Sequence, residues 1–212
     1  MPRSEIVFGT WNERKTADYA WSRPILGHPG LYFWALPYAI AMLEILPYAQ
    51  LPQSVRMELQ TAVDQEFGHI PVVQSTQWAT PDWATTLRVQ QVLATFYHLV
   101  ERIILLDDRP YRAVGLNNVI TLPAFRGRGH STQVLRTTEL FRWRELHAEL
   151  AVLLCADTLV PFYERLGCQC TRGATFFVQP AGRRQWTVNT MLRSPKAALP
   201  QPTEIDLQVY PW

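Results

Sequence analysis

The chain has 212 residues, of which 48% are hydrophobic and 18% charged, and its formal net charge is +2. This balance excludes a disordered chain, allows one ordinary domain with an appendage, and does not require a nucleic-acid partner. Three cysteines, at positions 155, 168 and 170, cannot form a disulfide framework and lack a zinc-binding pattern, so we expect a reduced, cytoplasmic protein without a metal.

Residues 1–40 form an N-terminal extension to which the sequence assigns no role. Its apolar stretch, residues 31–43, follows four basic residues and superficially suggests a signal peptide or a membrane anchor. Pro37 and the early Glu44 argue against a span, which needs about 20 uninterrupted apolar residues, and no convincing cleavage site is present. We expect no stable membrane association, and predict a packed aromatic-rich arm or a disordered leader.

Residues 41–193 are predicted to form one α/β domain with a mixed sheet. Apolar spacing and turn residues predict, in chain order, a strand over residues 43–48, a helix over 54–67, a strand over 85–92, and a hairpin of residues 96–106 and 111–122.

A short turn with two glycines and two arginines, residues 126–131, follows this hairpin. Gly127 and Gly129 leave the backbone uncovered. The helix predicted next, over residues 131–147, leaves its first N–H groups without intrahelical partners and carries partial positive charge there. The turn is therefore predicted to bind a phosphate group. The helix is expected to bury Val134, Leu135, Thr138 and Phe141.

Glycine-bearing turns before a helix also occur in other classes of phosphate-binding site. A Walker motif is excluded because no Gly-Lys pair is followed by Ser or Thr. A dinucleotide-binding turn stays open, because Gly127 and Gly129 lie between a strand and a helix and Asp157 ends the next apolar run, although Thr132 stands in place of the third glycine. A plain structural turn also stays open.

The remaining segments complete the predicted sheet. Residues 150–155 form a buried strand, and a helix that starts at Asp157 contains Pro161 in its first turn and stops at Gly167. Strands over residues 175–179 and 185–192 then close the sheet across a turn that contains Gly182. Residues 194–212 form a C-terminal tail.

Two of these segments resemble motifs of the GCN5-related N-acetyltransferases, the GNAT superfamily. The acetyl-CoA motif of that family is Gln/Arg-x-x-Gly-x-Gly/Ala, and residues 126–131 read Arg-Gly-Arg-Gly-His-Ser. The family's second motif, aromatic-Tyr-x-x-x-Gly, is matched by residues 162–167, which read Phe-Tyr-Glu-Arg-Leu-Gly. The resemblance implies a splayed mixed sheet flanked by helices, with acetyl-CoA as co-substrate.

The resemblance also implies roles for individual residues. The expected cofactor contacts are Val119, Ile120 and Thr121 along the pantetheine arm, and Arg126, Gly127, Arg128, Gly129, His130 and Ser131 at the pyrophosphate. Tyr163 is expected to protonate the leaving thiolate. The base is less defined, because Asn117 stands where the aminoglycoside 2'-N-acetyltransferases, the members most similar in layout, carry an acid. Glu101, on the preceding strand, is the alternative candidate for the base. It stays open that Glu101 is only a surface residue paired with Arg102.

The acceptor pocket is expected to be aromatic. The chain ends on Trp212, and in the aminoglycoside enzymes a terminal Trp closes this pocket. A free carboxylate on Trp212 would favour a cationic amine, although a tail docked on the sheet is equally compatible. Trp78, Asp82 and Trp83 are the candidates for the opposite wall, against the alternative that both tryptophans belong to the core.

The sequence therefore predicts an enzyme that transfers an acetyl group from acetyl-CoA to a primary amine of a small, aminoglycoside-like molecule, by direct attack in a ternary complex. A homodimer stays open. Two further classes also stay open: a CoA-binding sensor without catalysis, because Asn117 replaces a carboxylate, and a dinucleotide-binding protein.

Overall fold

The computed structural model describes residues 31–36, 39–196 and 198–212. Its strands are β1 (Leu31–Leu36), β2 (Ala39–Pro47), β3 (Trp83–Val89), β4 (Val92–Leu106), β5 (Arg109–Thr121), β6 (Leu150–Cys155), β7 (Gln169–Cys170), β8 (Ala174–Gln179), β9 (Gly182–Trp186), β10 (Asn189–Arg193) and β11 (Glu204–Asp206). Its helices are α1 (Gln53–Phe67), α2 (Pro71–Gln74), α3 (His130–Thr137) and α4 (Val160–Glu164), with a π-helical turn at Phe141–Glu145.

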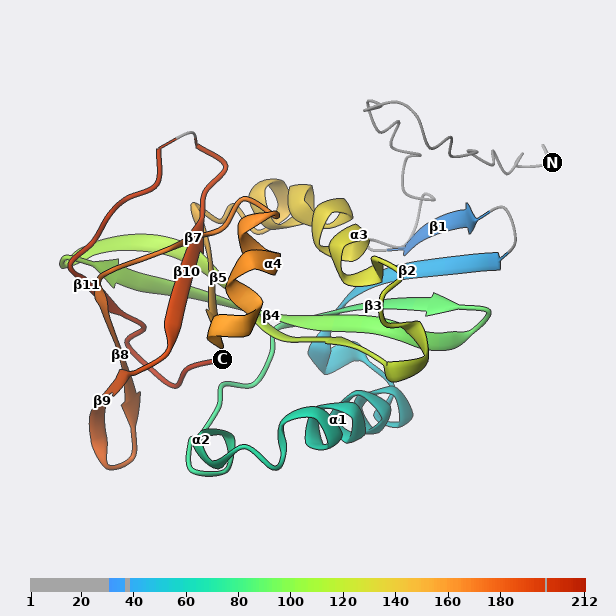
Figure 1. Ribbon diagram of the computed structural model, residues 1–212, viewed down its shortest axis with the longest axis horizontal. Helices are drawn as coiled ribbons and strands as arrows, with labels where there is room; N and C mark the ends of the chain where they lie inside the picture. Colours follow the sequence, from blue (N-terminus) through green and yellow to red (C-terminus); the bar gives the residue numbers. More distant parts are fainter. Residues whose placement is uncertain (1–30, 37–38, 197) are drawn as a thin grey trace.

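All the strands belong to one mixed sheet. Its main path runs β1-β2-β3-β4-β5-β6-β10-β7, and β11 joins β4 to the β8–β9 hairpin. Figure 1 shows α3 and α4 over one face of the sheet and α1 and α2 over the other. The predicted mixed α/β sheet flanked by helices is thus confirmed, and the apolar stretch that suggested an anchor contributes β1 and the start of β2. The part of the extension before residue 31 lies outside the described residues.

Three apolar clusters hold these layers together. The first joins the sheet to α3 and α4 and includes Tyr97, Leu116, Val134 and Tyr163. The second lies under α1, and the third packs β4, β5 and β6 against the C-terminal strands. The amphipathic sequence of α1 explains its place, because Leu59 and its neighbours on one stripe are the residues that it buries.

Two tight turns differ from the sequence prediction. The strand expected over residues 85–92 ends at Val89, because Gln90 and Gln91 both have positive φ and reverse the chain. Asp107 and Asp108 do the same, so the next turn has two residues and not the expected four. Left-handed pairs of this kind match the twist of a hairpin. A Gln-Gln pair carries no sequence signal for such a turn, which is why it was missed.

The long helix predicted over residues 131–147 is also interrupted. α3 ends at Thr137 and a π-helical turn begins at Phe141. The cause lies in side chains that compete for helix carbonyls: the Thr138 hydroxyl donates to Val134 O (2.8 Å) and Arg142 donates to Leu135 O (3.0 Å). Val134, Leu135 and Thr138 are buried as expected, and Phe141 is half-buried.

The strand predicted over residues 185–192 is two strands. β9 pairs with β8, residues 187 and 188 leave the sheet, and β10 pairs with β6 and β7. The single predicted strand was wrong because its two halves take different partners, which is a property of the tertiary structure.

The C-terminal tail is docked on the sheet. Asp107 accepts hydrogen bonds from the backbone and hydroxyl of Thr203 and from the backbone of Glu204. At the far end Trp212 is 2% exposed and lies against Gly115, where a Cβ atom would come within 2.1 Å of the indole. Gly115 is therefore required for the tail to pack.

We expect Gly115→Ala to lower the free energy of unfolding by about 1–3 kcal/mol, because the added methyl group overpacks the contact with Trp212. Denaturant unfolding followed by tryptophan fluorescence measures this. Adding Trp212→Leu to the Gly115→Ala chain should recover part of the loss by making room. An unchanged unfolding midpoint for Gly115→Ala would contradict the packing described.

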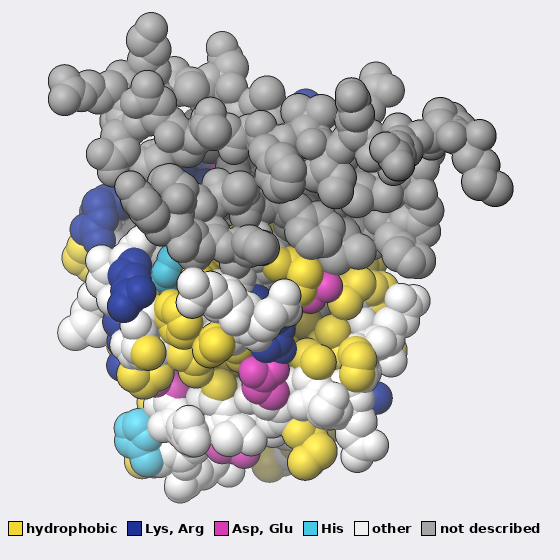
Figure 2. Space-filling view, turned by 90° about the vertical axis from the view of Figure 1, so that its right-hand side faces the viewer, with side chains coloured by type: hydrophobic (Ala, Val, Ile, Leu, Met, Phe, Trp, Pro, Cys, Tyr) yellow, Lys and Arg dark blue, Asp and Glu magenta, His cyan; other side chains and the backbone are white. Residues whose placement is uncertain are grey.

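The molecular surface is mixed in character. In Figure 2, the described part of the face carries acidic, basic and apolar side chains interspersed with one another. Across residues 31–36, 39–196 and 198–212, no helix is both long and apolar enough to cross a bilayer.

Candidate active site

The glycine-bearing turn presents free backbone donors at the start of α3. Gly127 and Gly129 have φ of 75° and 77°, and a Cβ atom on either would meet nothing within 4 Å. Within the described part of the chain, none of the N–H groups of residues 127–132 donates a hydrogen bond. These donors are open to solvent at the positive end of a helix, so the turn fits a phosphate group.

The basic side chains of the turn differ in availability. The Arg126 guanidinium donates to Glu66 (2.6 Å) and to Thr121 O (2.9 Å), so it braces the turn against α1 and β5. Arg128 lies over the ring of Phe125 at 5.7 Å and is exposed. It is the arginine of the turn whose charge is available to an anion.

His130 and Ser131 fix the first turn of α3. The His130 ring is buried, its Nδ1 has no partner among the described residues, and burial together with Arg128 lowers the pKa of this imidazole. Ser131 shares a hydrogen bond with the Thr121 hydroxyl, which donates to Thr95 (3.0 Å). The hydroxyl chain ties the turn to the end of β5.

β5 and β6 separate next to this turn. They pair in parallel from Ala113–Leu150 to Leu116–Leu153. Beyond that point β5 continues to Thr121, and no described strand pairs with it on this side. The splay that the resemblance implied is therefore present. It provides an opening in the sheet between β5 and the carboxyl end of β6.

A β-bulge in β5 lies at the mouth of the splay. Between the pairs His98–Asn117 and Phe96–Ile120, β4 has one residue and β5 has two, Asn118 and Val119. Asn118 has φ of 51°, and its side-chain amide donates to Nδ1 of His98 (3.2 Å).

The sequence reasoning did not single out His98. This residue is 3% exposed, Tyr48 and Phe96 pack on its ring, and its Nε2 is buried without a partner among the described residues. Its position opposite the bulge depends on the register of two strands, so no local sequence signal identified it.

His98 gives a pH dependence to stability. Burial lowers its pKa from 6.5 to about 4, so the unfolded chain binds this proton at a higher pH than the folded protein does. The stability due to neutral His98 is complete above pH 6.5 and is lost as pH falls toward 4, by roughly 3 kcal/mol. We expect His98→Leu to show a shallower decline across this window in urea unfolding. Parallel declines for the two proteins would refute the assignment.

Tyr163, on α4, lies beside the splay. It is 6% exposed, belongs to the same apolar cluster as Leu116 and Leu153, and its hydroxyl has no hydrogen-bond partner among the described residues. Burial, reinforced by Cys155 and Cys168, raises the pKa of the phenol above its ordinary value. The side chain therefore stays protonated at neutral pH and can donate a hydrogen bond.

The buried thiols nearby are poor nucleophiles. Burial raises the pKa of both Cys155 and Cys168 to about 11, and Cys155 donates to the sulfur of Met191. A thiol in that state is little ionised at neutral pH. The described residues also hold no cluster of three or more His, Cys, Asp or Glu side chains that could bind a metal.

Glu101, Asp82 and Trp83 form a separate group. Glu101 pairs with Val114 across β4 and β5, three residues along from Asn117, and its carboxylate accepts from the Trp83 indole (2.8 Å). Asp82 accepts from the backbone of Glu101 (2.7 Å), and Trp83 packs edge-on against Phe141 at 5.0 Å. The structure brings these three together on the face covered by α3.

Trp78 and Trp212 belong to the other face. The Trp78 indole donates to Val73 O and packs on Trp186, and Ala79 donates to Pro211 O, next to Trp212. The predicted wall of Trp78, Asp82 and Trp83 is thus divided between two faces of the sheet. Asn117 is half-buried at the start of the bulge.

Solved structures share the fold of this chain. The GNAT family N-acetyltransferase YhbS from Escherichia coli aligns with a TM-score of 0.54 at 11% identity, over 82% of this chain and 93% of that chain. An acyl-CoA N-acyltransferase from Pseudomonas aeruginosa aligns with a TM-score of 0.50 at 16% identity, over 73% and 99%. At these identities the likeness establishes the fold, which is the GNAT acyl-CoA N-acyltransferase fold.

Sequence comparison supplies a family match. No curated protein matches the chain. Residues 74–171, which include the glycine-bearing turn, the splay and Tyr163, match the family model of the acetyltransferase (GNAT) domain. The family match and the fold together support an acetyl-CoA-dependent acyltransferase.

Proposed function

We propose that this protein transfers the acetyl group of acetyl-CoA to a primary amine of a small molecule by direct attack in a ternary complex. The observation that carries the proposal is the row of free backbone donors at residues 127–132, next to a splay that is lined by buried Tyr163. A neighbour of the same fold, YhbS, was crystallised in complex with CoA, which supports the choice of donor.

The chain's own groups have distinct proposed roles. The N–H groups of the turn, with Arg128, hold the pyrophosphate, and Arg126 braces the turn. Main-chain groups of Val119, Ile120 and Thr121 align the pantetheine arm along the part of β5 that lies beyond its pairing with β6. The bulge turns the backbone of Asn118 and Val119 out of the regular ladder, where an amide can polarise the thioester carbonyl.

The proton balance follows from these positions. The amine nitrogen bonds to the carbonyl carbon while the carbon–sulfur bond breaks, and Tyr163 gives its proton to the departing sulfur. The amine loses one proton in the same reaction, which solvent carries to Glu101, the carboxylate proposed as base. Exchange with solvent then removes this proton from Glu101 and restores one to Tyr163 before the next turnover. Cys155 and Cys168 stay protonated and are poor nucleophiles, so neither is proposed to carry the acetyl group.

The experiment is a measurement of CoA thiol release from acetyl-CoA over a panel of primary amines, with the acetylated product identified by mass spectrometry. Amine-dependent release supports the proposal. Thermal stabilisation by acetyl-CoA without turnover on any amine would favour a CoA-binding sensor. Displacement of CoA by NAD would favour a dinucleotide site, which the mostly antiparallel sheet does not otherwise support.

A further inference from the structure

The β8–β9 hairpin contains a hollow of about 470 Å³ that no role described so far uses. We call it the hairpin hollow. Its lining is Thr171, Arg172, Gly173, Ala174, Thr175, Gln185, Trp186, Thr187, Val188, Asn189 and Thr190. Its size lies within the range of roughly 300–1,000 Å³ that small-molecule sites have.

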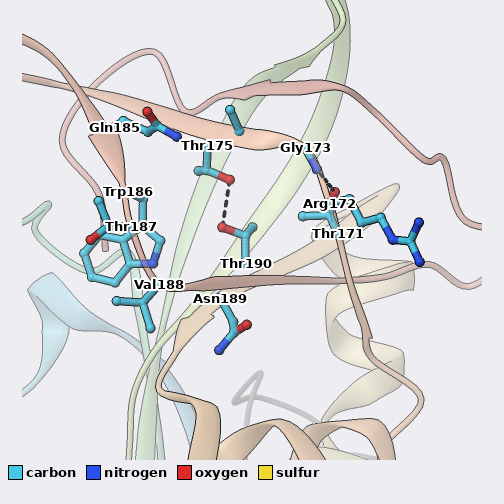
Figure 3. A pocket seen from close by; sticks show the side chains of 11 residues that line it. Thr171, Arg172, Gly173, Thr175, Gln185, Trp186, Thr187, Val188, Asn189 and Thr190 are labelled. Atoms are coloured by element: carbon cyan, nitrogen blue, oxygen red, sulfur yellow. Dashed lines mark hydrogen bonds between the residues drawn. The ribbon is translucent and has the colours of Figure 1, made fainter.

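The hollow exists because the chain changes strand partners twice, once on entering β8 and once on leaving β9. The chain leaves its pairing with β10 after Cys170 and joins β11 and β9 from Ala174. The returning chain leaves β8 after Trp186 and joins β6 from Asn189. Thr175 and Thr190 span the gap with a hydroxyl-to-hydroxyl hydrogen bond of 2.7 Å, which Figure 3 shows at the centre of the view.

The lining is rich in neutral polar groups. It offers the hydroxyls of four threonines, the side-chain amide of Gln185, the side-chain oxygen of Asn189 and the indole of Trp186, and it contains no carboxylate. Arg172 is exposed, and Figure 3 shows its guanidinium turned away from the Thr175–Thr190 pair. A polycation would find no opposite charge in this lining, whereas hydroxyl groups find both donors and acceptors.

Trp186 is held in place from behind. Trp78 and Phe177 pack edge-on against it at 6.2 and 6.3 Å, and its ring nitrogen is a buried donor without a partner among the described residues. A fixed indole gives an apolar ring a surface to pack on, and its nitrogen can donate to a ligand oxygen. The predicted role of Trp78 in acceptor binding would then be indirect, through Trp186.

The hollow also adjoins the reaction site. Asn189, on its rim, lies opposite Cys155 at the end of β6, and its amide donates to Asp157 (2.6 Å) and Cys155 O (3.4 Å). Cys155 and Tyr163 belong to one cluster beside the splay. A ligand in the hollow is therefore close to the strand end at which the thioester is proposed to lie.

We propose that the hairpin hollow binds the amine acceptor, and that this acceptor is a hydroxylated ring with a single amine, such as an amino sugar. The inference rests on the proposed function and names its substrate class. The amine nitrogen gains the acetyl group and loses a proton, and the sulfur of CoA gains one, so no further reactant is required.

The test compares kcat/KM for glucosamine, cyclohexylamine and spermine. We expect glucosamine to exceed cyclohexylamine by about 10²-fold or more, because a site that hydrogen-bonds hydroxyls rejects an analogue without them. Spermine, with several charges and no hydroxyl, should be no better than cyclohexylamine. Equal use of cyclohexylamine or spermine would overturn the inference.

Variants localise the effect. Trp186→Ala should raise KM for glucosamine about 10-fold and leave the Kd for CoA unchanged. Gln185→Ala, at an exposed rim position, should also raise KM for glucosamine, and it keeps the inference testable if Trp186→Ala does not fold. Val178→Ala, exposed on β8 and outside the lining, is the matched control. Unchanged KM in both lining variants would overturn the inference. If wild-type protein binds no CoA, the proposed function itself fails, and that result is distinct from a loss of acceptor preference.

Discussion

Tyr163→Phe is expected to lower kcat for amine acetylation by about 10²-fold or more, because it removes the proton donor for the departing sulfur. The Tyr163 side chain is 6% exposed and its hydroxyl has no hydrogen-bond partner among the described residues, so no other described group holds it away from a ligand. Single-turnover measurement of thiol release, at saturating acetyl-CoA, reports this step directly. The Kd for acetyl-CoA should not change.

The raised pKa of Tyr163 has two opposing effects on this role. It keeps the phenol protonated, and it also makes the phenol a weaker acid. The same apolar surroundings raise the pKa of the Cys155 and Cys168 thiols to about 11, so a thiolate that forms there is also a stronger base than in water. Proton transfer from Tyr163 to sulfur is therefore less unfavourable than the phenol alone suggests.

Tyr111→Phe is the matched control for this variant. Tyr111 is half-buried on β5, away from the splay. It packs in the third apolar cluster, the one between β4, β5 and β6 and the C-terminal strands. It should keep wild-type turnover. A Tyr163→Phe enzyme that releases thiol at the wild-type rate would remove Tyr163 from the mechanism.

His98→Leu is expected to lower kcat by about 10- to 100-fold while KM for acetyl-CoA changes little. Its Nδ1 accepts the hydrogen bond that holds Asn118, with φ of 51°, in the left-handed conformation of the bulge. Without that acceptor the bulge amide is free to move, and small displacements of a positioned group cost about 10²-fold in rate. His98 is thus a positioning residue and not a catalytic one.

A double-mutant cycle separates this role from general destabilisation. Asn118→Gly keeps the left-handed conformation accessible and removes the side-chain amide. If His98 acts through Asn118, each single variant and the double variant should lose a similar amount of kcat. Additive losses would contradict the coupling. Thr86→Val, the control, changes a different buried polar residue, on β3, and should leave kcat unchanged.

The elements that the sequence predicted well are those with a local cause. The strand over residues 150–155 has the predicted bounds because one apolar run is buried on both faces, and the helix over residues 54–67 begins only one residue early. α4 ends at Glu164, three residues before the predicted stop, and Gly167, with φ of 82°, closes the turn that follows, where its N–H donates to Glu164 O. The glycine-bearing turn also lies where it was expected, between β5 and α3.

The parts that the sequence did not predict depend on contacts between distant strands. His98 and Asn118 meet only because β4 and β5 shift register by one residue. Trp186 and the Thr175–Thr190 pair line a hollow that forms where two strands exchange partners. Trp78 and Trp83, five residues apart, belong to different packing groups, since Trp83 packs in the cluster under α3 and Trp78 packs on Trp186, which apolar composition does not reveal.

The central claim is that the free N–H groups at residues 127–132 grip the pyrophosphate of CoA, and calorimetric titration with CoA tests it most directly. We predict that wild-type protein binds CoA and that Gly129→Val weakens binding about tenfold, because a β-branched residue is strained by roughly 1–2 kcal/mol at positive φ. Gly182→Val, at a positive-φ glycine in the β8–β9 turn, should bind as wild type does. Absence of any heat of association between CoA and the wild-type protein would contradict the account.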